Sequence, residues 1–141
     1  MLIYSWHYLN GMSDAELARV SEENLQAAIV AYLQEEHPTV LFKCDTSAVK
    51  MSIGQARKMK QLGNTAKWPD LFIAKAAHGF AGNFIEIKKE GTLITRANGK
   101  YASSHIQRQA DLMLRLCENN FRAGFAVGWR KLLEEVQWYL S

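Results

Sequence analysis

The chain is poor in cysteine and has no long apolar stretch, and both absences exclude whole classes of protein. Cys44 and Cys117 are the only cysteines among its 141 residues, too few for a disulfide framework, and their spacing matches no zinc motif. They are expected to behave as small buried side chains. No apolar run approaches the roughly 20 residues of a membrane span, and the first residues lack the features of a secretory signal. We therefore expect a cytoplasmic protein that contacts no membrane.

The chain also lacks internal repeats, low-complexity tracts and linkers rich in proline, glycine or serine. Its length lies within the range of about 100–200 residues that is usual for one domain, so we expect a single domain over residues 1–141. A hydrophobic content of 48% and a charged content of 22% are ordinary for a globular protein. This composition excludes a disordered chain, a collagen and a coiled coil.

Acidic and basic residues are unevenly distributed along the chain. The net charge is only +3, but residues 1–40 sum to −5 and residues 41–110 to +8, while residues 111–141 balance. A middle segment with such an excess of lysine and arginine can bind a polyanion such as nucleic acid. Charge alone fits a solvated cationic surface equally well, so it leaves both alternatives open.

Hydrophobic periodicity and capping residues predict helices that alternate with short strands, as in an α/β or α+β domain. The aromatic residues 1–12 give no assignment and are expected to pack on the domain or to form a subunit interface. The expected helices begin at Ser13 or span 21–36, 52–62, 103–119 and 131–140, and the expected strands span 40–44, 70–74, 83–88 and 124–128. The apolar stripe expected on the 103–119 helix comprises Ile106, Ala110, Met113, Leu114 and Cys117.

Charged residues on two of these strands give the clearest indication of chemistry. Asp70 begins one strand, and Glu86 and Lys88 lie two residues apart on another, so they share one face. If the strands pair, two carboxylates and a lysine converge, and close carboxylates need a cation. Mg²⁺ often takes one or two carboxylates together with water and phosphate oxygens. Spacing alone favours a simpler alternative, in which Glu86 and Lys88 form a surface ion pair and Asp70 follows a turn.

Pro69-Asp70 followed by Glu86-Ile87-Lys88 is the most specific of several motifs that occur in order along residues 20–140. A glutamate precedes Gln26, a lysine-rich helix ends at Gly63, a later helix carries Gln109, and a glycine-bounded strand spans 124–128. Together these motifs resemble the VRR-NUC (virus-type replication-repair nuclease) family of the PD-(D/E)XK nuclease superfamily. Residues 1–20 would then be an N-terminal extension, and residues 21–140 the nuclease core. Lys67-Trp68 stands where many relatives have glycine, which alters the turn or adds a substrate contact.

The resemblance implies an α/β fold with a restriction-endonuclease-like core, in which helices flank a mixed central β-sheet. It implies a metal-dependent DNA endonuclease that hydrolyses phosphodiester bonds, with branched DNA resembling a Holliday junction as its substrate. Mg²⁺ or Mn²⁺ is the implied cofactor, and a homodimer in a bacterial or phage-infected cell is the implied assembly. Cleavage of flap or duplex DNA on the same fold, or nucleic-acid binding without catalysis, are the alternatives.

The resemblance also implies a role for each residue of the site. Lys88 would polarise water or stabilise charge on the phosphate, and Gln109 would orient the assembly. The implied metal ligands are Asp70, Glu86, the Ile87 carbonyl and Glu22.

Helical periodicity helps to choose Glu22 and Gln109 among their neighbours. Glu22 precedes Leu25 by three residues and Ile29 by seven, so it is predicted to lie on the inward stripe of its helix. Glu23 is the alternative, and both glutamates also suit a helix N-terminus without any catalytic role. Gln109 borders the apolar stripe of its own helix, where a buried amide needs hydrogen-bond partners.

Basic residues precede the Pro69-Asp70 corner and follow the Glu86-Ile87-Lys88 strand. If the strands converge, these cations flank the carboxylates and can hold a phosphate backbone, although each is also explained as a solvated surface residue. Trp68 can stack on a base or pack on the core, with packing preferred, and His105 can contact phosphate or cap its helix. The predicted nucleic-acid-binding residues are Arg57, Lys58, Lys60, Lys67, Lys89, Arg96 and Lys100.

Overall fold

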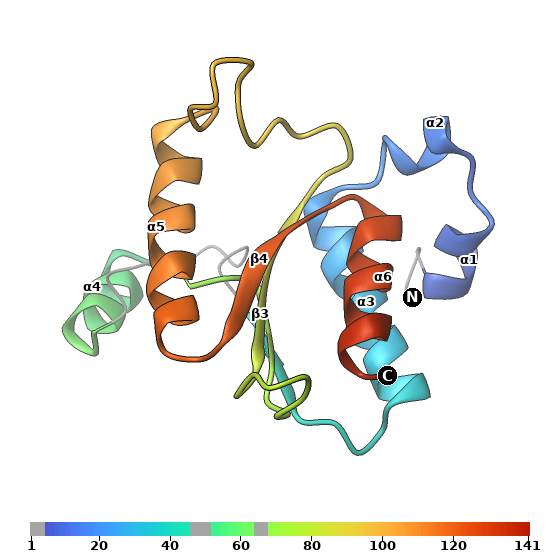
Figure 1. Cartoon of the computed structure of the whole chain (residues 1–141), viewed down its shortest axis with the longest axis horizontal. Helices are drawn as coiled ribbons and strands as arrows, with labels where there is room; N and C mark the ends of the chain where they lie inside the picture. The colour runs from blue at the N-terminus through green and yellow to red at the C-terminus, as the bar shows by residue number, and fades with distance from the viewer. Residues whose placement is uncertain (1–4, 46–51, 64–67) are drawn as a thin grey trace.

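A computed structural model of the chain describes residues 5–45, 52–63 and 68–141, which contain a four-stranded sheet flanked by helices (Figure 1). The strands lie side by side in their order along the chain. β1 pairs with β2 and β2 with β3 in antiparallel fashion, whereas β3 and β4 are parallel. The predicted α/β class with a mixed central sheet is confirmed. The strands are β1 (Phe42–Cys44), β2 (Leu71–Ile73), β3 (Asn83–Lys88) and β4 (Arg122–Val127).

Serine residues set the start of most helices. The side chains of Ser13, Ser21, Ser52 and Ser103 each accept a hydrogen bond from the backbone N–H three residues later, as the predicted helix starts require. In the part of the chain that the structure describes, no helix has the length and apolar character needed to cross a membrane. The helices are α1 (Trp6–Asn10), α2 (Asp14–Leu17), α3 (Glu22–Glu36), α4 (Ile53–Gln61), α5 (Ser104–Glu118) and α6 (Trp129–Tyr139).

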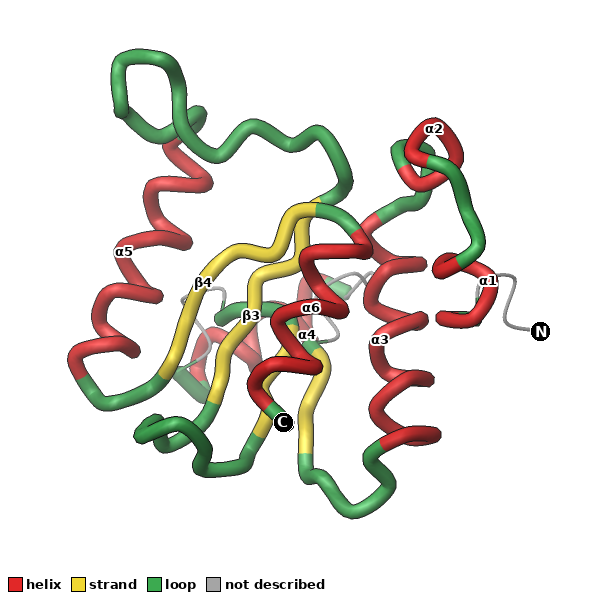
Figure 2. Tube along the Cα trace, turned by 45° about the vertical axis from the view of Figure 1, so that its right-hand side comes forward, coloured by secondary structure: helices red, strands yellow, loops and turns green. Residues whose placement is uncertain are grey.

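The two faces of strand β3 meet different parts of the fold. Figures 1 and 2 show α3 and α6 on one side of the sheet and α5 on the other. Ile85 and Ile87 face α3 and α6 and belong to the core, whereas Glu86 faces α5, where it accepts a hydrogen bond from Gln109. Because successive side chains of a strand alternate in direction, this arrangement also turns Lys88 toward α5. All six residues of β3 are buried.

Residues 5–12 pack on the rest of the fold, which was one of the two expectations for residues 1–12; residues 1–4 lie outside the described residues. Leu9 of α1 is fully buried in the core, and the side chain of Asn10 accepts a hydrogen bond from the Trp129 indole N–H at 2.7 Å. Arg130 at the start of α6 pairs with Asp14 of α2. Helix α1 was not predicted, because five residues are too few to show a helical period.

Several predicted details of the last helices and strands are wrong. The buried stripe of α5 consists of Ile106, Gln109, Met113 and Leu116, whereas Leu114 and Cys117 are exposed. This stripe passes through a glutamine, so apolar spacing alone could not place it. Strand β4 and helix α6 each begin two residues earlier than expected.

The two cysteines differ in their surroundings. Cys44 is half-buried, and burial together with the charge of Asp70 raises the pKa of its thiol to about 11, so the thiol stays neutral at physiological pH. Cys117 is exposed, so the expectation of a small buried side chain is wrong there.

Gly128, which joins β4 to α6, offers a test of the fold. Its backbone lies at φ 85° and ψ 166°, a region that is essentially restricted to glycine, and an added Cβ would collide with the Glu90 carboxyl group. We expect Gly128→Ala to lower the free energy of unfolding by about 3 kcal/mol in urea denaturation, since such strained backbone costs of that order. Gly124→Ala is the matched control, because a Cβ at Gly124 in β4 meets no atom within 4 Å. Equal effects of the two substitutions would contradict this explanation.

Candidate functional site

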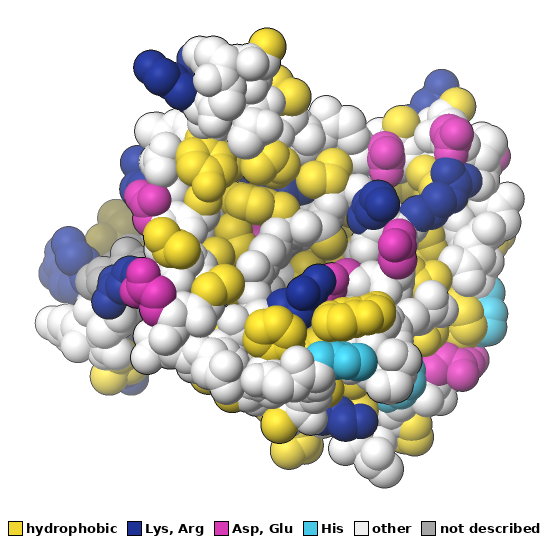
Figure 3. Space-filling view, viewed as in Figure 1, with side chains coloured by type: hydrophobic (Ala, Val, Ile, Leu, Met, Phe, Trp, Pro, Cys, Tyr) yellow, Lys and Arg dark blue, Asp and Glu magenta, His cyan; other side chains and the backbone are white. Residues whose placement is uncertain are grey.

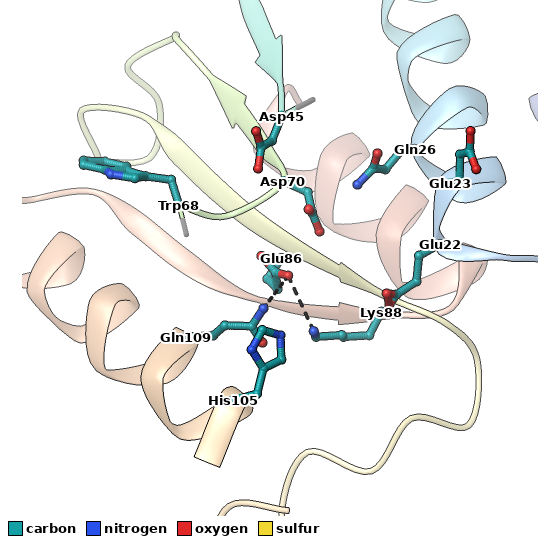
Figure 4. Close-up of a pocket in the computed structure, with 10 residues that line it drawn as sticks. All are labelled: Glu22, Glu23, Gln26, Asp45, Trp68, Asp70, Glu86, Lys88, His105 and Gln109. Atoms are coloured by element: carbon teal, nitrogen blue, oxygen red, sulfur yellow. Dashed lines mark hydrogen bonds and ion pairs between the residues drawn. The ribbon is translucent and has the colours of Figure 1, made fainter. Parts of the chain in front are cut away.

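A pocket of about 230 Å³ brings charged residues from three parts of the fold together (Figure 4). Its walls come from the first turns of α3, the residue after β1, the residues before β2, the second half of β3 and the first half of α5. The pocket therefore lies where α5 and α3 approach the same stretch of the sheet. The residues that line it are Glu22, Glu23, Gln26, Asp45, Trp68, Asp70, Glu86, Lys88, His105 and Gln109.

Strand pairing places Asp70 beside Glu86. Leu71 of β2 lies opposite Ile85 of β3 in an antiparallel register, so the residue before Leu71 meets the residue after Ile85. Asp70 is 9% exposed and Glu86 is 6% exposed. The backbone N–H of Ile87 donates a hydrogen bond to Asp70 Oδ2 at 2.9 Å, which fixes the Asp70 carboxyl group against β3. The predicted convergence of the two strands is thus observed.

Burial raises the pKa of both carboxyl groups. Burial is the main reason that the pKa of Glu86 rises to about 8, and the nearby charge of Asp70 adds to it. Burial likewise raises the pKa of Asp70, although the hydrogen bond from Ile87 opposes the rise. Two buried acids that lie side by side cannot both be ionised at a low cost in free energy unless a cation or a shared proton is present.

Lys88 and Gln109 both contact the Glu86 carboxylate. Lys88 Nζ lies 3.5 Å from Glu86 Oε1, and Gln109 Nε2 donates a hydrogen bond to the same oxygen at 2.8 Å. Lys88 is only 7% exposed, so its ammonium group acts in a region with little water. Gln109 Oε1 is buried, and no donor among the described residues reaches it. A buried acceptor without a partner in a polar pocket marks a place for water or a ligand donor.

The glutamates at the start of α3 also line the pocket. Glu22 is exposed, so the prediction that it lies on the inward stripe is wrong; it is the first residue of α3, one turn before the buried stripe begins at Leu25. Its charge nevertheless raises the pKa of Asp70, which shows its proximity. In Figure 4 the Glu22 side chain extends toward Lys88, whereas the Glu23 carboxylate points away from the carboxylate pair. This difference favours Glu22 over Glu23 as a member of the site.

The donor groups of the pocket are compatible with a divalent cation. Within the described ranges no three His, Cys, Asp or Glu side chains form a cluster that could hold a metal ion. The donor set is instead the Asp70–Glu86 pair with main-chain and solvent oxygens, and Mg²⁺ often binds through one or two carboxylates in this way. Burial raises the pKa of both acids, so a cation bound between them would favour their charged forms. Ile87 lies beside both acids, and the role of its carbonyl oxygen stays a prediction.

Comparisons with known proteins identify the fold. A scan against protein-family models gives no match, and no curated protein matches the sequence. One similar solved structure is described as "VRR_NUC domain protein", with a TM-score of 0.63 and 22% sequence identity over 86% of this chain and 88% of that one. The two chains share a fold. The similarity confirms the predicted restriction-endonuclease-like core, and at this level of identity it extends to the fold alone.

Two pocket residues, Asp45 and Gln26, were not predicted as site residues. Asp45 follows β1, and its backbone N–H donates a hydrogen bond to the Asp70 carbonyl oxygen at 2.6 Å, so β1–β2 pairing brings it to the pocket. Gln26 lies one helical turn after Glu22, and in the sequence it stood out only as the glutamine of the family-like motif, with no role given to it. The register of two short strands is not readable from their residues, so Asp45 carried no signal of its own.

The predicted phosphate-binding cations that the structure describes do not line the pocket. Figure 3 shows basic side chains over α4 and over the loop between β3 and α5. Every residue of α4 is exposed, and within the loop Arg96 Nη2 donates a hydrogen bond to the Ala102 carbonyl oxygen at 3.1 Å. Lys67 lies outside the described residues. The six described cations are all exposed: Arg57, Lys58 and Lys60 on α4, and Lys89, Arg96 and Lys100 in the loop.

Proposed function

We propose that the protein is a metal-dependent endonuclease that hydrolyses phosphodiester bonds of DNA. The observation that carries this proposal is the buried Asp70–Glu86 pair, whose carboxylates lie together with Lys88 in one open pocket. The fold supports it, because the similar solved structure is named for a nuclease domain. The excess of basic residues over 41–110 supports a polyanionic substrate.

The chain's own residues suggest how such a reaction is catalysed. Asp70 and Glu86 would hold Mg²⁺ or Mn²⁺, with Glu22 and the Ile87 carbonyl as further donors. When bound, such an ion lowers the pKa of water and offsets charge on a phosphate. Lys88, already oriented by its 3.5 Å contact with Glu86, would stabilise the negative charge that develops on the phosphate. Gln109 would fix the Glu86 carboxylate through its hydrogen bond, as partners of metal ligands commonly do.

We further propose branched DNA as the substrate and a homodimer as the active form. Two symmetric cuts need two carboxylate pockets, and the part of the chain that the structure describes forms the pocket around Asp70 and Glu86. A two-fold dimer presents two pockets in a symmetric arrangement, which suits two symmetric cuts in a junction. Flap and plain duplex DNA are the competing substrates on the same fold.

The test is cleavage of labelled DNA by wild-type protein, Glu86→Ala and the control variant Asp111→Ala. Asp111 is an exposed acid on α5 whose side chain accepts a hydrogen bond from Gln107. A four-way junction, a flap and a plain duplex are each incubated with Mg²⁺, Mn²⁺ or EDTA. We expect wild type and Asp111→Ala to cleave only with a metal, the junction fastest, and Glu86→Ala to be inactive.

The possible results separate the alternatives. Equal cleavage by Glu86→Ala and wild type would contradict the proposed site. Cleavage of the flap or duplex in preference to the junction would correct the substrate. DNA binding without cleavage under any condition would favour the non-catalytic alternative.

A further inference from the structure

Trp68 combines an exposed indole with a place at the rim of the carboxylate pocket. It is 47% exposed and lines the pocket together with Asp70 and Glu86 (Figure 4). Tryptophan is among the residue types most enriched at binding surfaces, because its large rigid ring gives contact area at little entropic cost. An indole that is half open to solvent beside two acids is therefore available for a ligand.

An aromatic cluster holds this indole in position. The rings of Trp68 and Phe84 have centroids 5.6 Å apart, and Phe84 stacks on Phe72 at 4.3 Å with an interplanar angle of 16°. Phe121 packs edge-on against both phenylalanines. Pro69, which is buried and has a fixed φ angle, connects Trp68 to Asp70. The indole is thus fixed relative to the carboxylate pair.

The same cluster sets the spacing between the indole and the pair. Phe84 and Glu86 lie on the same face of β3 and are two residues apart, which is about 6.6 Å along a strand. Trp68 packs on Phe84, so it lies beside the acids rather than over them. A nucleic-acid strand whose phosphate lies at the acids would bring a neighbouring base to the indole.

We propose that Trp68 stacks on an unpaired nucleobase next to the phosphate at the Asp70–Glu86 pair, an inference that rests on the proposed nuclease function. Stacking on an aromatic side chain tolerates every base, because each base has a flat π face. In an intact duplex both faces of a base are covered, so a base must be unpaired or displaced to reach a side chain. The site thus selects DNA by the presence of an unpaired nucleotide rather than by sequence.

Trp138 provides a matched comparison within the same chain. It is 42% exposed, yet the Arg122 guanidinium lies 4.5 Å from its ring and His78 stacks on it at 4.2 Å. It does not line the carboxylate pocket. Replacement of Trp138 by leucine therefore removes a comparable indole without changing the pocket.

The experiment measures DNA binding in EDTA, so that it does not depend on cleavage. Fluorescence anisotropy is used to compare a labelled duplex that carries a single-stranded flap with the same duplex fully paired. Trp68→Leu keeps apolar packing on Phe84 but removes the flat ring, whereas Trp68→Phe keeps a ring. We expect wild type to prefer the flap DNA and Trp68→Leu to bind it about 10-fold more weakly, within the range measured for loss of one base–aromatic stack. Trp68→Phe and Trp138→Leu should stay within about 3-fold of wild type.

Each result bears on the inference. It is overturned if Trp68→Leu still prefers flap DNA to paired DNA. It is also overturned if Trp68→Leu binds both DNAs more weakly by the same factor, because Trp68 then only packs against the fold. Thermal melting checks the fold of every variant. Should Trp68→Leu fail to fold, quenching of tryptophan fluorescence by flap DNA is expected in wild type and not in Trp68→Phe, and equal quenching overturns the inference. If the preference for flap DNA depends on Trp68 but the protein cleaves no DNA, the stacking site is supported and the proposed nuclease function is overturned.

Discussion

Replacing Glu86 by glutamine is expected to lower metal-dependent DNA cleavage by about 10³-fold, the order of effect seen when one group that stabilises a transition state is lost. Glutamine keeps the size of the side chain and an oxygen that can accept the hydrogen bond from Gln109. It removes one of the two negative charges that would hold the cation. The rate of cleavage with Mg²⁺ is compared with that of Asp111→Asn, which removes an exposed acid outside the pocket.

The same substitution is expected to stabilise the metal-free protein at high pH. The pKa of Glu86 is about 8 in the fold and 4.5 without it, so the folded state retains a proton that the unfolded state loses. Stability that is fully present below pH 4.5 is therefore lost as the pH rises through 8. Glu86→Gln removes this loss, and we expect its melting temperature in EDTA to exceed that of wild type by about 5 °C at pH 8 and by less at pH 6. A lower melting temperature at pH 8, or a wild-type rate of cleavage, would contradict the role given to Glu86.

Replacing Lys88 by methionine is expected to have the second large effect. Methionine matches the length of the lysine stem but removes the charge that lies 3.5 Å from Glu86 Oε1. We expect cleavage to fall by about 10³-fold, because the charge that develops on the phosphate loses its partner. Metal-free stability at pH 8 should fall by about 3 kcal/mol, since Lys88 lowers the pKa of both Asp70 and Glu86 and its removal leaves these two buried acids without a nearby cation. Lys131→Met, which removes an exposed lysine paired with Glu134 on α6, should match wild type in both measurements.

The double variant separates charge from simple damage to the fold. Because Glu86→Gln removes the charge that Lys88 compensates, adding it to Lys88→Met should restore most of the lost stability. It should restore none of the cleavage. Additive losses of stability in urea denaturation would show that the two side chains do not interact as the structure indicates.

The proximity of Glu86 and Lys88 could be predicted from the sequence because it depends only on local strand geometry. Glu86 and Lys88 are two apart on a strand, so alternation alone puts them on one face. Asp70 adjoins the short strand that pairs with β3. Gln109 could be chosen because a polar residue interrupts the periodicity of a strong helix, and it is buried as expected.

Other parts of the site depend on packing between distant segments. Asp45 reaches the pocket only through the register of β1 on β2, which three-residue strands do not encode in their side chains. Glu22 was expected to be buried because it lies on the same side of its helix as Leu25. It is exposed instead, because it is the first residue of α3 and no preceding helical turn covers it. The capping box of helix α4 predicts where this helix begins. No residue of α4 is buried, so no apolar stripe indicates in which direction its lysines point.

Titration of the metal-free protein with Mn²⁺ at pH 7.5, followed by calorimetry, tests the central claim most directly. We predict saturable binding accompanied by release of protons, because the acids with raised pKa must lose their protons to hold the ion. The binding should be lost in Glu86→Gln and kept in Asp111→Asn. The absence of saturable binding in wild type, or equal binding in wild type and Glu86→Gln, would contradict a cation site at the Asp70–Glu86 pair.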